Sequence, residues 1–111
     1  MAKFSCNLKA SASKTADYLN SGILNHAATV ELVDSEVIKC GNDTVYLSVY
    51  DKYYVRNSSR TSLTVMITGN DVLCTVTAIS SVGGSSAILN FSFGSEENFI
   101  SVVEKLVSEY K

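Results

Sequence analysis

The 111-residue sequence lacks proline, contains a single histidine and has no long apolar run. Without proline, no predicted strand or helix is interrupted by a residue that cannot donate a backbone hydrogen bond. No stretch approaches the ~20 apolar residues of a membrane-spanning helix, and the N-terminus has no apolar run of signal-peptide length. We therefore expect one cytoplasmic domain over residues 1–111, with no membrane partner.

The scarcity of charge and of metal-binding motifs argues against further classes of function. A formal net charge of −2 provides no basic surface for phosphate groups, so we expect no nucleic-acid partner. No Cys-x-x-Cys or His-Glu-x-x-His motif occurs, and we expect no metal and no cofactor. We interpret the lone His26 either as a cation that complements the dipole at the end of the first helix or as a capping donor there. No catalytic residue is identified.

The three cysteines are an odd number at wide, unrelated spacing: Cys6, Cys40 and Cys74. Each lies in a segment that resembles a strand, where a free thiol behaves as a small apolar residue. We therefore expect three reduced, buried thiols.

Alternation of apolar and polar residues dominates the middle of the chain and is typical of half-buried strands. It predicts a first strand, then extended segments before Gly41, and then four strands in succession: 3–9, 28–33, 36–40, 44–56, 61–68, 72–80 and 87–93. Gly41-Asn42-Asp43 and Gly69-Asn70-Asp71 supply residues that tolerate the positive φ of tight turns.

Two segments have the 3.6-residue period of an amphipathic helix. Ser11 or Ser13 is suited to begin the first, which is expected to end near Gly22. Ser95 begins the second, whose apolar stripe should lie on the sheet: Phe99, Val102, Val103, Leu106 and Tyr110. The order of elements predicts a two-layer α+β fold, with a curved antiparallel sheet of about six strands and both helices on one face.

The strand over 44–56 has two faces that differ in character. The more apolar set is expected to face the helices: Val45, Leu47, Val49, Tyr53 and Val55. The other set would then lie on the outer face of the sheet: Tyr46, Ser48, Tyr50, Lys52, Tyr54 and Arg56. Apolar residues of other segments are expected beside these tyrosines: Met66, Leu73, Ile79 and Ile88. This outer face is the main clue to function.

Two resemblances add to this interpretation. The order of elements resembles the helix-grip fold of START-domain and plant-allergen-like ligand carriers. Short segments are also similar to a family of small, functionally uncharacterised bacterial proteins, mainly from low-GC Gram-positives: 1–9, 22–25, 69–71 and 78–81 with the Gly-Gly-Ser that follows. The second resemblance implies a bacterial, cytoplasmic protein and supplies no site residues.

Two hypotheses from different classes of function fit these observations. The first is a non-enzymatic binding module that forms a homodimer through the outer sheet face. Its candidate partner surface consists of Tyr46, Tyr50, Tyr54, Arg56 and Arg60. The second is a carrier of a lipid or metabolite, or an enzyme, with a cavity between the sheet and the C-terminal helix. The candidate polar groups of that cavity are Asp51, Tyr53 and Tyr110.

Overall fold

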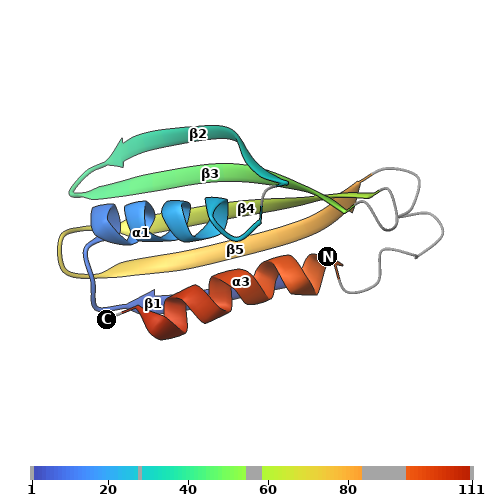
Figure 1. The fold of residues 1–111 in the computed structure, drawn as a ribbon. Coiled ribbons are helices and arrows are strands. Elements are labelled where there is room, and N and C mark those ends of the chain that lie inside the picture. Colours follow the sequence, from blue (N-terminus) through green and yellow to red (C-terminus); the bar gives the residue numbers. More distant parts are fainter. Residues whose placement is uncertain (1, 28, 55–58, 84–94, 111) are drawn as a thin grey trace.

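The computed structural model describes residues 2–27, 29–54, 59–83 and 95–110. Its elements are β1 (Ala2–Leu8), α1 (Ala12–Leu24), β2 (Val30–Cys40), β3 (Asp43–Tyr54), β4 (Ser59–Gly69), β5 (Cys74–Gly83) and α3 (Ser95–Glu109). All strand pairs are antiparallel and form one sheet in the order β1-β5-β4-β3-β2. Both helices lie on the same face of this sheet (Figure 1). The predicted α+β class is confirmed.

The sheet has five strands in the described part of the chain, where about six were expected. The sixth expected strand, 87–93, lies outside the described residues. The two extended segments between 28 and 40 form the single strand β2, with a shift in register between Leu32 and Asp34. β2 is an edge strand, and every residue after Val30 in it is exposed.

Both expected turns join neighbouring strands. Gly41 follows β2 with a φ of 63°, a conformation that glycine adopts without steric cost. In the turn between β4 and β5, Oδ1 of Asn70 accepts hydrogen bonds from the backbone amides of Val72 at 2.9 Å and Leu73 at 3.0 Å. The carbonyl oxygen of Asn70 accepts from the amide of Ala12 at 2.9 Å, so this turn also positions the start of α1.

Helix α1 begins as predicted but ends later. The hydroxyl of Ser11 accepts from the amide of Lys14 at 3.4 Å and caps the helix. The helix then continues past Gly22 to Leu24. A Cβ atom at Gly22 would lie 2.7 Å from both terminal methyl carbons of Leu106. Gly22 is therefore a position where α1 and α3 approach closely, and it does not terminate the helix.

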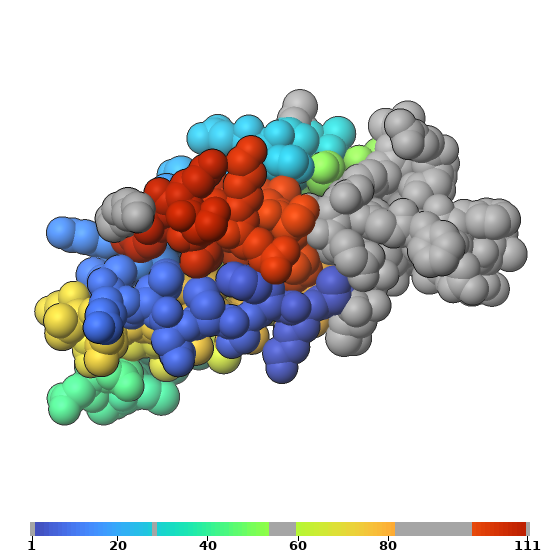
Figure 2. All heavy atoms as spheres, turned by 90° about the horizontal axis from the view of Figure 1, so that it is seen from below, coloured from blue at the N-terminus to red at the C-terminus, as the bar shows by residue number. Residues whose placement is uncertain are grey.

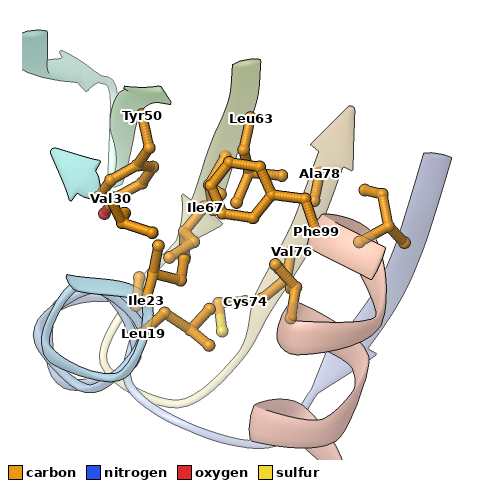
Figure 3. Packing of buried hydrophobic residues seen from close by; sticks show 14 residues of the cluster. Leu19, Ile23, Val30, Tyr50, Leu63, Ile67, Cys74, Val76, Ala78 and Phe99 are labelled. Carbon is orange, nitrogen blue, oxygen red and sulfur yellow. The ribbon is translucent and has the colours of Figure 1, made fainter. Parts of the chain in front are cut away.

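The core fills the space between the sheet and the two helices. Phe99 and Val103 of α3 are fully buried, as are Leu63 of β4 and Val76 of β5. Figure 3 shows the Phe99 side chain reaching from α3 toward the sheet, while Leu19 and Ile23 approach from α1. The expected packing of the C-terminal helix on the sheet is confirmed for these residues, and Leu106 is half-buried.

The two faces of β3 are opposite to the prediction. Tyr50 is only 2% exposed, and its hydroxyl donates to Oδ1 of Asn20 on α1 at 2.7 Å. The register pairs Tyr50 with the buried Leu63, whereas Leu47 pairs with the exposed Met66. The inner residues of β3 are Tyr46, Ser48, Tyr50 and Lys52, and the outer residues are Val45, Leu47, Val49, Asp51 and Tyr53. Val55 lies outside the described residues.

This error has a physical origin. Both alternating sets of β3 contain enough apolar surface for a core, and a tyrosine is stable in a core when its hydroxyl has a partner. Asp51 was the available signal, because it belongs to the set that was assigned inward. A buried carboxylate without a partner is costly, which favours the opposite assignment.

The cysteines differ in environment. Cys74 is buried, Cys6 is half-buried and Cys40 is exposed, and all three are free. The expectation of burial is wrong for Cys40 because it lies on the edge strand β2.

Candidate functional site

The structure does not bring together the residues expected to form one partner surface. Tyr46 is half-buried against the core and Tyr50 is buried within it. Arg60 is exposed on the outer face, where its guanidinium forms an ion pair with Asp51 at 3.2 Å. Arg56 and the side chain of Tyr54 lie outside the described residues. The described tyrosines and Arg60 therefore lie on opposite faces of the sheet.

The outer face nevertheless has an apolar surface made of other side chains. Its members come from four strands: Ile38 of β2, Val45, Leu47 and Val49 of β3, Met66 of β4 and Ile79 of β5. Ile38 is 43% exposed, Met66 40% and Ile79 37%. The register pairs Ile38 with Val45 and Leu47 with Met66, so these residues are neighbours. We call this set the outer apolar patch.

Charged side chains flank the outer apolar patch unevenly. Three acidic residues lie on the outer face of β2: Glu31, Asp34 and Glu36. At the opposite edge of the sheet, β1 carries Lys3 on the same face, opposite Ile79. The outer face is therefore acidic along one edge and basic at the other.

The expected cavity residues do not lie around a shared space. Asp51 and Tyr53 are on the outer face, away from both helices. Tyr110 stacks on Tyr18 with ring centres 4.4 Å apart, and its hydroxyl accepts from Thr15 at 3.2 Å. The Tyr18 hydroxyl donates to the carbonyl oxygen of Leu106 at 2.6 Å. Tyr110 therefore joins α3 to α1.

A groove of about 530 Å³ lies on the helical side of the sheet. It is bordered by the C-terminal part of α1, the second half of α3 and the inner face of β3. Its lining residues are Gly22, His26, Lys52, Ser101, Val102, Lys105, Leu106 and Glu109. In the space-filling view of Figure 2, α3 (red) lies at the surface with β1 (dark blue) beside it. The groove is bounded by the side of α3 that faces α1, and two of its lining residues, Val102 and Leu106, are partly buried and also pack against the core.

His26 and Lys52 form the electrostatic centre of this groove. The Nζ atom of Lys52 lies 3.1 Å from Nε2 of His26. Burial lowers the pKa of Lys52. Burial and, secondarily, the Lys52 charge also lower the pKa of His26. The Lys52 ammonium group can donate to Nε2 when the imidazole is neutral, the form that the lowered pKa of His26 favours. This differs from the expected role of His26 as a cation at the helix end.

Sequence reasoning missed the groove because its lining comes from three separate elements. Lys52 was assigned to the outer face together with Tyr50, so it could not be placed near His26. A correct assignment of the β3 faces would have placed Lys52 on the helical side. The spacing of Val102 and Leu106, one helical turn apart, predicted packing, and both residues do pack against the core; that they also line a groove was not predicted.

The described residues include neither a membrane-spanning helix nor a cluster of metal ligands. None of their helices is long and apolar enough to cross a membrane. No group of three or more His, Cys, Asp and Glu side chains among residues 2–27, 29–54, 59–83 and 95–110 is arranged to hold a metal ion.

The structure thus defines a two-layer α+β domain with a sheet face that neither described helix covers and a groove beside its helices. The chain belongs to a family of unknown function, DUF6054, whose model matches residues 1–111. The resemblance to a functionally uncharacterised family is confirmed, while its bacterial range stays a prediction. No curated protein matches the chain. Among solved structures, TTHA0849 from Thermus thermophilus is similar at 12% identity over 95% of this chain and 92% of that chain, with a TM-score of 0.34. No property is transferred from a likeness of this size.

Proposed function

We propose that this protein is a non-enzymatic bacterial binding module that forms a homodimer through the outer apolar patch. The observation that carries the proposal is the exposure of neighbouring apolar side chains on a face that neither described helix covers. Contiguous apolar surface of this kind marks interaction sites on soluble proteins. The three free thiols favour a reducing compartment, so we place the dimer in the cytoplasm.

The charges on this face favour a second copy of the chain as the partner. A two-fold axis parallel to the strands would place β1 of one copy opposite β2 of the other. Lys3 of each copy would then face the acidic row of Glu31, Asp34 and Glu36, with the outer apolar patch between them. Two sheets packed in this way lie about 10 Å apart, with side chains interdigitating. Tyr46 and Tyr50 are no longer part of the proposed surface, whereas Arg60 stays at its margin.

Sedimentation equilibrium at micromolar concentration tests this proposal. We expect the wild-type protein at twice the 12.0 kDa mass of one chain. Met66→Lys places a charge in the middle of the patch at an exposed position, so it should give a folded monomer. Ser21→Lys adds the same charge at an exposed position on α1 and should remain a dimer. A monomeric wild-type protein, or a dimeric Met66→Lys variant, would contradict the proposal.

A second candidate function is that of a small-molecule carrier. The groove of about 530 Å³ supports it, because ligand pockets commonly measure ~300–1,000 Å³ and combine apolar walls with a few polar groups. Val102 and Leu106 supply apolar walls here, and His26, Lys52 and Ser101 supply polar groups. Thermal-shift screening against lipids and metabolites tests this candidate. Reproducible stabilisation by one chemical class supports it, and no stabilisation across a broad library contradicts it.

A further inference from the structure

We propose that the groove between α1 and α3 binds a small organic carboxylate, with its charged end at Lys52 and His26. The apolar part of the ligand would lie against Val102 and Leu106. The inference rests on the second candidate function, because it specifies the chemical class that the groove selects. It is independent of dimerisation, since the groove and the outer apolar patch lie on opposite sides of the sheet.

The preference for an anion follows from the groups that line the groove. Among the described lining residues, three can donate from charged or ionisable nitrogen atoms, namely His26, Lys52 and Lys105, whereas one, Glu109, is acidic. Lys52 and His26 are close enough for both nitrogen atoms to reach one ligand group. Both groups can carry a positive charge, and the two charges would then repel each other. An anion placed beside them would compensate this repulsion.

The number and type of donors favour a carboxylate over a phosphate. Phosphate sites typically use arginine forks or the backbone amides of a helix N-terminus. The lining contains no arginine among the described residues, and the groove lies beside the C-terminal part of α1. Lys52 and the protonated form of His26 match the two oxygen atoms of a carboxylate, with one donor for each oxygen. The carboxylate of Glu109 would repel a dianion more strongly than a monoanion.

Binding of a carboxylate should be coupled to proton uptake. In the free protein, burial and the Lys52 charge hold the pKa of His26 below its ordinary value of 6.5. A bound carboxylate stabilises the protonated imidazole, so the pKa of His26 rises on binding. The other ionisable groups among the described residues of the groove are Lys52 from β3 and Lys105 and Glu109 from α3. By linkage, affinity should increase as the pH falls through the range in which His26 titrates.

Three probes with the same six-carbon chain test the selection of charge: hexanoate, hexanol and hexylammonium. We expect hexanoate to shift the NMR signals of His26 in a saturable manner and to raise its titration midpoint. Hexanol and hexylammonium should bind at least about tenfold more weakly, since they lose a charge-assisted hydrogen bond. Because this comparison uses the wild-type chain, it does not depend on the folding of a variant.

Lys52→Met tests the site itself, because it removes the ammonium group and retains the apolar stem. It should weaken hexanoate binding about tenfold and leave hexanol binding unchanged. Lys14→Met removes an exposed charge from α1, outside the groove, and should change neither affinity. If hexanol binds the groove as tightly as hexanoate, the proposed anion selection is wrong while the carrier function stands. If no probe binds, the carboxylate proposal is wrong, and the thermal-shift screen across a broad library decides the carrier function separately.

Discussion

The two faces of β4 show how differently one strand can be used. On the inner face, Leu63, Val65 and Ile67 are at most 3% exposed beneath the helices. On the outer face, Met66 lies between two of these residues in sequence and is 40% exposed. Both faces contain apolar side chains, so apolar character alone does not identify the core. The difference arises from the helices, which cover only one face.

The largest predicted effect comes from the covered face. Phe99→Ala should lower the free energy of unfolding by about 3–5 kcal/mol, because it removes a fully buried ring and leaves a cavity. This is a large part of the ~5–15 kcal/mol that stabilises a typical domain. Met66→Ala on the uncovered face should cost the isolated monomer less than about 0.5 kcal/mol. Urea unfolding of both variants, each compared with the wild-type chain at a protein concentration low enough for the monomer to predominate, tests this contrast. Equal costs for the two substitutions would contradict it.

A smaller effect separates the two faces of β3. Tyr50→Phe should cost about 1 kcal/mol, since it removes the hydrogen bond from the Tyr50 hydroxyl to Asn20 in a largely buried place. Tyr53→Phe makes the same chemical change on the outer face, where Tyr53 is 41% exposed, and should be close to neutral. Unfolding curves in urea should therefore show a lower midpoint for Tyr50→Phe alone. A lower midpoint for Tyr53→Phe alone would contradict this account and would favour the orientation of β3 that was predicted from the sequence, with Tyr53 inward and Tyr50 outward.

The smallest effect concerns the pH dependence of stability. The pKa of His26 is lowered in the folded protein, so folding disfavours its protonation. Between the folded pKa and the ordinary value of 6.5, the unfolded chain binds more protons than the folded one. His26 should therefore reduce stability as the pH falls through this range. An NMR titration should give a midpoint below 6.5, and His26→Gln should show a weaker loss of stability on acidification. A midpoint above that ordinary value would contradict this account.

The sequence predicted the elements better than the directions of their side chains. The stripe of Phe99 and Val103 identified α3 because a helix with one apolar side has few ways to be buried. Gly41 and Asn70 identified their turns through local conformational preferences. These features depend on neighbouring residues, which the sequence displays directly.

The candidate site depended on information that the sequence does not display. The faces of β3 depend on its register with β4, and both alternating sets of β3 are compatible with burial. That single ambiguity placed Tyr50 and Lys52 on the wrong side, and the groove could not be anticipated once Lys52 was misplaced. The close approach at Gly22 depends on Leu106, a residue of the other helix.

The pairing of β1 with β5 determines when the chain can complete its fold. Ala2 pairs with Ser80 and Leu8 with Cys74, so β1 is synthesised well before the strand with which it pairs. Closing such a long loop costs entropy before any contact is gained, and chains dominated by distant contacts fold slowly. The hairpins β2–β3 and β4–β5 can form earlier from nearby residues. On a ribosome, β1 therefore remains without its partner strand, and within reach of chaperones, until β5 has emerged.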